Sequence, residues 1–287
     1  MEIPFDVIKL IASYITQHKM KLLDWIDVNM INWCSMSVNP NGIDLLKDNF
    51  DKIYWNELSE NPNAIHLLEA NPDKINWVYL SSNPNAIHLL EANLDKINWK
   101  ILSRNPNGIS LLESNQDKIS WDILSSNPNG ISLLKANLDK IYWPWLSSNP
   151  SGIPLLEANP DKIDWRGLSG NPNGIHLLQA SPDRIDWRFL SENPNGIHIL
   201  EKNIMYINWC GLSRNPKGIN LLKANPEQID WDWILHNTNG IHLLKDKDNK
   251  KINMYILSKN PSIFEPDLEL LNKTISIKAT KLDPILN

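Results

Sequence analysis

The chain has 287 residues, of which 42% are hydrophobic and 21% are charged, and its formal net charge is −5. This composition is ordinary for a folded protein. The negative charge argues against a nucleic-acid partner, which requires clustered lysine and arginine. No apolar run approaches the roughly 18 residues that a membrane span needs, so we expect no membrane partner either.

The N-terminal region, residues 1–32, precedes the repeats. Pro4 suits the first turn of a helix, and the apolar residues after it have helical spacing. One interpretation is a cap that covers the apolar face of the first repeat, as stacked repeats require. The other is a docking helix. The run Ile-Pro-x-Asp-Val-Ile-x-x-Ile-x-x-Tyr-Ile over residues 3–15 resembles the opening helix of an F-box, the motif by which substrate receptors bind cullin-type ubiquitin ligases.

A 22-residue repeat occupies residues 33–264, and its clearest marker is the series Trp33, Trp55, Trp77, Trp99, Trp121, Trp143, Trp165, Trp187, Trp209 and Trp231. Counted from each tryptophan as position 0, Leu recurs at +3, Ser at +4, Asn at +6, Pro at +7, Ile at +10, a Leu pair at +12 and +13, and Asn at +16. A fixed period in this range is typical of stacked-repeat proteins. Helix packing distances of about 9–10 Å per unit predict a curved rod about 100 Å long, made of ten to eleven units.

Proline positions indicate where helices begin in each unit. Pro154 follows Ile153 and Pro144 follows Trp143, and proline is tolerated only in the first turn of a helix. Helices should therefore begin near Ile153 and near Tyr142. Asn, Asp or Ser usually precedes the tryptophan, and these are good N-cap residues. We expect an all-α solenoid whose units contain two two-turn helices joined by Asn-Pro turns.

A leucine-rich-repeat-like solenoid is the alternative, because its period is similar and it places a short strand in each unit. A strand would put the tryptophan and the +2 residue on one face. The +2 residue is Glu57 or Gly167 as readily as Ile101. The spacing of three between Trp and Leu is helical, so we favour the α-solenoid.

The tryptophan column is predicted to be structural, at Trp55, Trp77, Trp99, Trp121, Trp143, Trp165, Trp187 and Trp209. A fully buried tryptophan removes about 150–250 Å² from water, a gross stabilisation of about 4–6 kcal/mol. On this basis Trp121→Ala should cost about 3–5 kcal/mol. Toward the C-terminus the repeat gains one residue and Met254 replaces the tryptophan, so we expect residues 265–287 to form a C-terminal cap and tail.

Residues with catalytic or metal-binding chemistry do not converge. His66, His88, His176, His198 and His242 share one column, but stacked helices lie about 8–10 Å apart, whereas metal ligands lie about 2 Å from one ion. Cys34 and Cys210 are eight units apart, too far for a disulfide, and unpaired thiols fit a reducing compartment. We expect no catalytic, cofactor-binding or metal-binding residue, no small-molecule substrate and no enzyme activity.

Positions +1, +2 and +5 vary while the recurring Trp, Leu, Ser, Asn and Ile frame of the unit stays fixed. The +2 column contains the predicted partner-binding residues Tyr79, Ile101, Ile123, Trp145, Phe189 and Trp233. Repeat proteins bind through variable stripes of this kind, and aromatic residues dominate binding hot spots. The alternative is that +2, four residues after a constant Ile, only fills the interface between helices.

The unit resembles a family of uncharacterised repeat proteins of large DNA viruses that infect amoebae, as in NPNAIHLLEANLDKINW over residues 83–99. The resemblance implies a viral protein located in the cytoplasm of an infected cell or in the virion. Three hypotheses remain open. The first is a non-enzymatic scaffold that binds a protein through the variable stripe. The others are a substrate receptor of a cullin-type ubiquitin ligase and a structural virion component.

Overall fold

The computed structural model of the chain describes residues 19–245 and 252–268, and helices dominate these ranges. The all-α repeat solenoid is confirmed. Strands within the described ranges are limited to β1 (Met20–Leu22) and β2 (Phe264–Pro266), both outside the tryptophan segments. The leucine-rich-repeat-like alternative is therefore wrong. The F-box-like run over residues 3–15 and the predicted tail after residue 268 lie outside the described residues.

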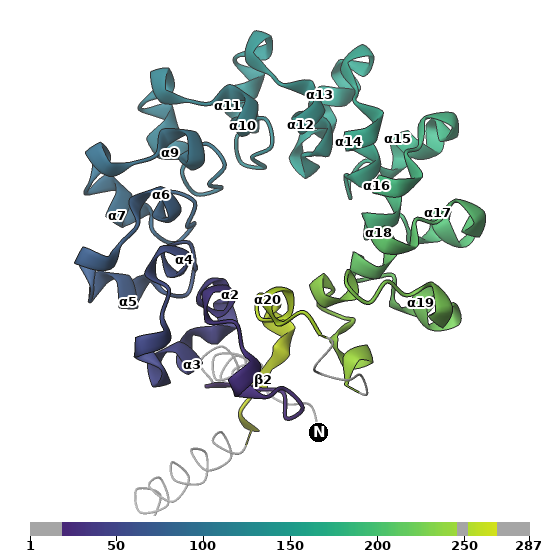
Figure 1. Cartoon of the computed structure of the whole chain (residues 1–287). Coiled ribbons are helices and arrows are strands. Elements are labelled where there is room, and N and C mark those ends of the chain that lie inside the picture. The colour runs from purple at the N-terminus through teal and green to yellow at the C-terminus, as the bar shows by residue number, and fades with distance from the viewer. Residues whose placement is uncertain (1–18, 246–251, 269–287) are drawn as a thin grey trace, which may run out of the picture.

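Two concentric layers of helices make up the solenoid (Figure 1). The inner layer consists of α2 (Trp33–Val38), α4 (Trp55–Ser59), α6 (Trp77–Leu80), α8 (Trp99–Leu102), α10 (Trp121–Leu124), α12 (Trp143–Ser148), α14 (Trp165–Gly170), α16 (Trp187–Glu192), α18 (Trp209–Arg214), η13 (Ile234–His236) and α20 (Met254–Leu257). The outer layer consists of α3 (Ile43–Asp48), α5 (Ile65–Glu69), α7 (Ile87–Glu91), α9 (Ile109–Glu113), α11 (Ile131–Lys135), α13 (Ile153–Ala158), α15 (Ile175–Ala180), α17 (Ile197–Glu201), α19 (Ile219–Ala224) and η14 (Ile241–Leu244).

The α-helices have four to six residues, so they are shorter than the predicted two turns. The segment before most tryptophans is also helical, as a 3-10 turn: η3 (Phe50–Lys52), η4 (Pro72–Lys74), η5 (Leu94–Lys96), η6 (Gln116–Lys118), η7 (Leu138–Lys140), η9 (Pro160–Lys162), η10 (Pro182–Arg184), η11 (Ile204–Tyr206) and η12 (Pro226–Gln228). Further 3-10 turns are η1 (Val28–Met30), η2 (Pro40–Gly42), η8 (Pro150–Gly152) and η16 (Pro261–Ile263). Isolated helices this short are unstable in water, so packing between units must hold them.

Helix starts follow the prolines and caps as predicted. The helix α13 begins at Ile153, and α12 begins at Trp143 with Tyr142 as its N-cap. The side chain of Asn76 accepts hydrogen bonds from two backbone N–H groups of α6. Ser120 is an exception, because its hydroxyl donates to Asp122 instead of capping α10.

The core between the two layers is built mainly from leucine, not tryptophan. Leu124 at +3 and Leu134 at +13 are fully buried, and the same positions are buried around the solenoid. The tryptophans are only partly buried against this core. Several are covered by a lysine of the 3-10 turn that follows later in the same unit: Lys140 lies 4.4 Å from the Trp121 ring centroid. The predicted full burial of the tryptophan column is therefore wrong, because the indoles lie beside the 3-10 turns at the edge of the core.

Buried asparagines at +6 connect each unit to the one before it. The side-chain N–H of Asn127 donates to the carbonyls of Ser103 and Asn105 at 3.1 and 2.9 Å, and its Oδ1 accepts from the N–H of Asn129 at 3.0 Å. The column is Asn in all eleven units, counting Met254 as the start of the eleventh. Because each asparagine is fully paired while buried, the ladder stabilises the stack without leaving unsatisfied polar groups.

The solenoid closes into a ring, which corrects the predicted open rod (Figure 1). Asn39 of the first unit donates to the carbonyls of Ser258 and Asn260 in the eleventh, at 2.9 and 3.1 Å. The backbone N–H of Asn32 donates to Ser258 Oγ at 3.1 Å. These bonds repeat the pattern found between consecutive units, so the eleventh unit occupies the place of a unit preceding the first.

Close packing on the inner side produces the curvature. A Cβ added to Gly167 of α14 would lie 2.8 Å from the carbonyl oxygen of Pro144 in α12, so these inner helices are nearly in backbone contact. The outer helices are spread around a larger circumference (Figure 1). Each unit is therefore a wedge, and eleven wedges share the full turn at about 33° each.

A two-stranded clasp takes the place of the eleventh outer helix. After η16 the chain enters β2, which pairs antiparallel with β1 so that Lys21 is opposite Glu265. The N–H of Leu23 extends the pairing by donating to the carbonyl of Ile263 at 2.9 Å. Parts of the two predicted cap regions thus pair with each other at the ring closure.

Candidate functional site

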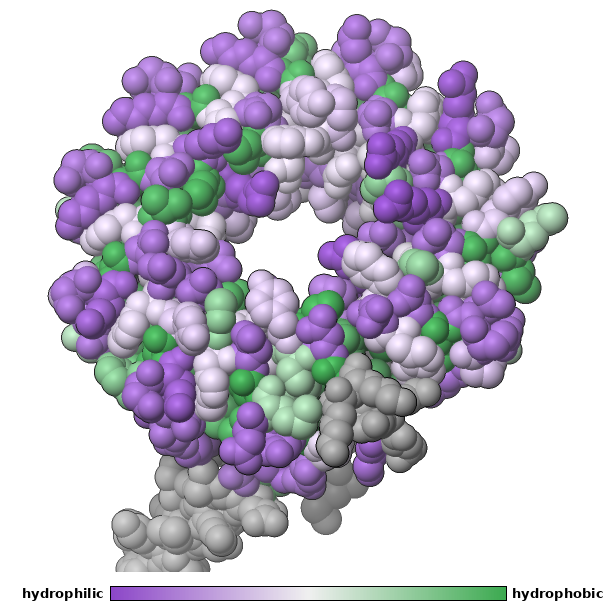
Figure 2. All heavy atoms as spheres, in the orientation of Figure 1, coloured by the Kyte–Doolittle hydropathy of each residue, from purple (hydrophilic) through white to green (hydrophobic). Residues whose placement is uncertain are grey.

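The variable positions line the central hole of the ring. In an α-helix successive residues are 100° apart, and +3 and +4 of the inner helices are buried toward the outer layer. Positions +1, +2 and +5 lie on the opposite side of the helix. We call this surface the rim, and Figure 2 shows it surrounding an open hole.

A cavity of about 550 Å³ opens on the rim where four consecutive units meet, and we call it the rim cavity. Its apolar walls come from α6, α8 and α10 and include Val78, Tyr79, Ile101 and Ile123. Tyr79 is 39% exposed and Ile123 only 7%. Figure 2 shows apolar surface at the inner edge between α6 and α10. Three of the six residues predicted from the +2 column are brought together here.

Charged groups surround the apolar walls of the rim cavity. Lys100 and Arg104 line it and are exposed, and neither has an ion-pair partner among residues 19–245 and 252–268. Glu60 lines its other side, and burial raises the pKa of this carboxyl, with Lys259 opposing the shift. The carboxyl of the next rim residue, Asp122, has a lowered pKa, chiefly because it accepts a hydrogen bond from Ser120.

Arginines occupy the rim on the opposite side of the hole. Arg166, Arg188 and Arg214 lie on α14, α16 and α18 at +1, +1 and +5, and we call them the arginine arc. The guanidinium of Arg166 lies 4.7 Å from the ring centroid of Phe189, and that of Arg188 lies 6.0 Å from it. Figure 2 shows strongly hydrophilic surface at the inner edge beside α14 and α16.

The other three predicted residues lie elsewhere on the rim. Trp145 is 38% exposed on α12, one unit beyond the residues that line the rim cavity. Trp233 is 41% exposed on the far side, where Arg214 lies 5.8 Å from its ring. Phe189 is partly buried and leans on Gly170. The burial of Ile123 agrees with the interface-filling alternative, whereas the exposure of Tyr79 and the two tryptophans agrees with a binding surface.

Rim arginines were missed by the sequence reasoning, although the sequence contains a signal for them. The chain has five arginines, and four of them, Arg104, Arg166, Arg188 and Arg214, occupy +1 or +5. Lysines, in contrast, recur at the last position of six 3-10 turns, from Lys52 to Lys162. A count of charged residue types by column would have separated the two sets.

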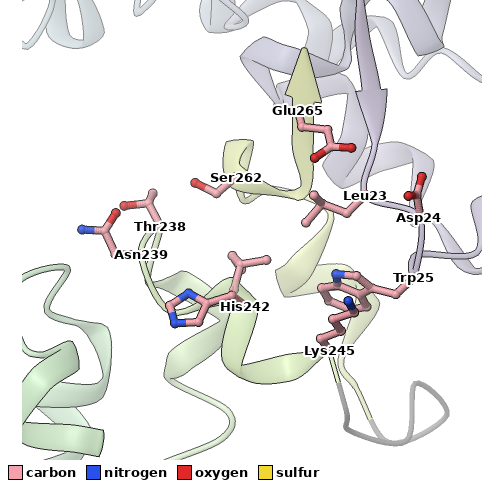
Figure 3. Close-up of a pocket in the computed structure, with 10 residues that line it drawn as sticks. Leu23, Asp24, Trp25, Thr238, Asn239, His242, Lys245, Ser262 and Glu265 are labelled. Atoms are coloured by element: carbon pink, nitrogen blue, oxygen red, sulfur yellow. The ribbon is translucent and has the colours of Figure 1, made fainter. Parts of the chain in front are cut away.

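A second cavity, of about 710 Å³, lies at the ring closure (Figure 3). Its walls come from segments far apart in sequence, including Trp25 of the N-terminal region, His242 of η14, Lys245 directly after it, and Glu265 of β2. The cavity lies where an eleventh outer helix would stack. It therefore follows from replacing a helix by the thinner strand pair.

Histidine and cysteine side chains have local partners instead of converging. His88 Nε2 lies 2.9 Å from Glu69 Oε1 of the preceding unit, and His176 has the same relation to Glu157. The Cys210 thiol donates to Asp230, and this contact is the main cause of its raised pKa. No group of three or more His, Cys, Asp or Glu side chains suited to a metal ion occurs in the described part of the chain.

Comparison with known proteins gives one partial match. The sequence model of a family described as periplasmic copper-binding protein (NosD) matches residues 26–163, slightly less than half of the chain. The matched segment consists mainly of the first six repeat units. Its candidate copper ligands, among them Cys34, His66 and His88, lie on separate units. The donor set therefore does not fit a copper site.

Searches of curated proteins and of solved structures return no match. Across the two described ranges, no helix combines the length and apolar character that a membrane crossing requires.

Proposed function

We propose that this protein is a non-enzymatic interaction ring that holds a protein partner against the rim of its central hole. The observation that carries the proposal is the position of the variable columns. The recurring Leu, Ser and Asn positions of each unit (+3, +4 and +6) are buried, whereas +1, +2 and +5 vary on the side of the inner helices that faces the hole. Outer positions such as +11 vary too, but variable residues on a concave surface are typical of repeat proteins that bind other proteins.

The rim cavity is the strongest candidate anchor point. Exposed aromatic residues beside a cavity of this size can bury a large apolar side chain of a partner. Tyr79 in the third unit and Trp145 in the sixth supply such aromatic groups, and more than a third of the surface of each is exposed. These features support a binding role over a purely structural one.

The test compares capture of partners by the wild type and by Tyr79→Ala/Trp145→Ala. Proteins captured from an infected-cell extract are identified by mass spectrometry, and the best candidate is purified for affinity measurement. We expect the variant to melt near the wild-type temperature and to lose the partner. The matched control is Tyr54→Ala/Leu138→Ala, which removes side chains of 52% and 48% exposure away from the rim. Equal binding by both variants, or a large loss of stability with binding retained, would overturn the proposal.

The ligase-receptor hypothesis needs a different variant, because it concerns residues 3–15. Deletion of residues 2–18 leaves β1 in place, whereas truncation at residue 25 would also remove one strand of the clasp. Cullin-ligase components lost on this deletion would favour a substrate receptor. Abundance in purified particles would instead favour the virion hypothesis.

A further inference from the structure

The two sides of the rim differ in chemistry, and this difference bears on the kind of partner. The rim cavity side presents Val78, Tyr79 and Ile101, followed by Trp145. The opposite side presents the arginine arc, in which Glu192 is the one carboxylate on the +1, +2 and +5 positions of α14, α16 and α18. An object inside the hole would therefore meet an apolar wall and a cationic wall at the same time.

The hole limits the shape of the object. Eleven helices packed side by side at about 9 Å place their axes on a circle about 32 Å across. Subtracting a helix diameter of about 10–12 Å leaves a hole of about 20 Å. A single helix, about 10–12 Å wide, fits this space and can contact both walls where long side chains such as Arg, Glu and Tyr extend across the remaining width. A flat membrane or a globular domain cannot reach the rim.

The arginine arc is available for binding. Arg166 and Arg188 have no ion-pair partner in the ranges that the structure describes, and Arg214 lies 3.7 Å from Glu192 in an exposed contact. The nearby carboxylates of Asp164 and Asp186 already accept backbone N–H groups as N-caps. Phe189 stacks beneath Arg166 and fixes its position. Guanidinium groups arranged in this way suit carboxylates, which they can bind through two hydrogen bonds.

We infer that the partner presents an amphipathic α-helix, with one apolar and one acidic face, that lies within the hole between the rim cavity and the arginine arc. The apolar face contacts Tyr79 and Ile101, and the acidic face contacts Arg166 and Arg188. This inference rests on the proposed function and adds the chemistry of the bound segment. It assigns a binding role to the arginine arc, which has no evident part in holding the fold together.

The experiment uses the full chain and two fluorescein-labelled helical peptides of about 18 residues, a length of about 27 Å. Both carry leucine on one face, and the other face carries glutamate in one peptide and lysine in the second. Fluorescence anisotropy measures their affinities. We expect the glutamate peptide to bind at least about tenfold more tightly, because like charges across an interface are strongly unfavourable.

Charge reversal then tests the location. Arg166→Glu/Arg188→Glu should weaken binding of the glutamate peptide by at least about tenfold and shift the preference toward the lysine peptide. The matched control is Arg184→Glu, which reverses a charge in a 3-10 turn where Arg184 pairs with Asp183. Tyr79→Ala/Ile101→Ala should weaken the binding of both peptides by a similar factor.

Equal affinity for the two peptides, or no change on charge reversal, would overturn the inference. Failure of both peptides to bind would overturn it as well. The proposed function would survive either result if Tyr79→Ala/Trp145→Ala still loses its captured partner, so the two failures are distinguishable.

Discussion

The seam between the fourth and fifth units and the seam that closes the ring use the same chemistry. At the internal seam Asn127 donates to two carbonyls of the preceding unit at 3.1 and 2.9 Å. At the closing seam Asn39 donates to two carbonyls of the eleventh unit at 2.9 and 3.1 Å. What differs is the chain, which continues through one seam and not through the other. Closure therefore needs no special interface, because the two ends of the stack are already complementary.

The outer layer shows a second difference between the seams. At the internal seam two outer helices, α9 and α11, flank the joint. At the closing seam the β1–β2 clasp takes the outer position, with Lys21 and Glu265 paired at 3.2 Å on an exposed surface. Such exposed pairs contribute about 0–1 kcal/mol. This ion pair therefore adds little to the closure, which is held by the inner asparagine ladder, the backbone pairing of the two strands and buried residues such as Ile263.

The largest effect is expected at the internal seam. Asn127→Ala would leave the carbonyl of Ser103 and the N–H of Asn129 without a partner and would remove one of the two hydrogen bonds to the carbonyl of Asn105. Because a buried unsatisfied group costs about 1–3 kcal/mol, we expect a loss of about 3–5 kcal/mol in the free energy of unfolding, measured with urea. The control is Asn129→Ala, which removes one exposed bond to Pro106 and should cost below about 1 kcal/mol. Similar losses for both would contradict the ladder as the main link.

The equivalent change at the closing seam should have a different outcome. Asn39→Ala removes the same bonds, but the ends can separate there without breaking the chain, so the ring can open instead of unfolding. We expect a larger radius of gyration by small-angle X-ray scattering and a loss of about 1–3 kcal/mol. An unchanged radius together with a loss equal to that of Asn127→Ala would show that closure is not independent of global folding.

Tryptophan replacement gives a moderate effect. Trp121 is partly buried and covered by Lys140, so Trp121→Ala should cost about 2–3 kcal/mol, below the value for a fully buried indole. Lys140→Ala should cost about 0.5–1 kcal/mol, the usual size of a cation–π contact. A double-mutant cycle measured by denaturation should give a coupling of that size. The closing unit has Met254 at this position, so Met254→Ala lacks the coupling and serves as the comparison.

The smallest effect concerns Glu60. Its pKa is influenced by the charge of Lys259, a residue of the eleventh unit on the other side of the closing seam. Burial raises its pKa in the folded protein, so ionisation of Glu60 costs stability as the pH rises from the ordinary value of 4.5 through the raised pKa. At pH 7 we expect the melting temperature of Glu60→Gln to be about 1 °C above that of the wild type. At pH 3 the two melting temperatures should be the same. Glu91→Gln, at an exposed outer position, is the control. Stabilisation that persists at pH 3 would rule out a titration effect.

The periodicity of the sequence was sufficient to predict the repeat units and the residues at which their helices begin. Pro144 and Pro154 located α12 and α13, and helical spacing placed the variable columns on one face. The ladder was missed because Asn-Pro-Asn-Gly is also typical of a turn. Position +6 nevertheless stands out, because it is Asn in all eleven units. Burial of the tryptophans was overestimated, because large size and recurrence do not distinguish the centre of a core from its edge.

Ring closure could not be predicted from the periodicity. The wedge angle depends on small differences between inner and outer packing, such as the close approach at Gly167, and these accumulate over eleven units. The rim cavity likewise depends on side chains of four units meeting across the seams. The cap and docking interpretations of residues 1–32 stay predictions for the part that precedes residue 19.

The fixed wedge angle restricts how this protein can change in evolution. An open solenoid tolerates duplication or loss of one repeat, because each unit contacts only its neighbours. Here a twelfth wedge of about 33° would overlap the first unit, and a ring of only ten units would leave a gap of the same size. Ring closure therefore constrains the number of repeats more strictly than the length of the loops, and we expect insertions to be tolerated only where they leave the inner circumference unchanged.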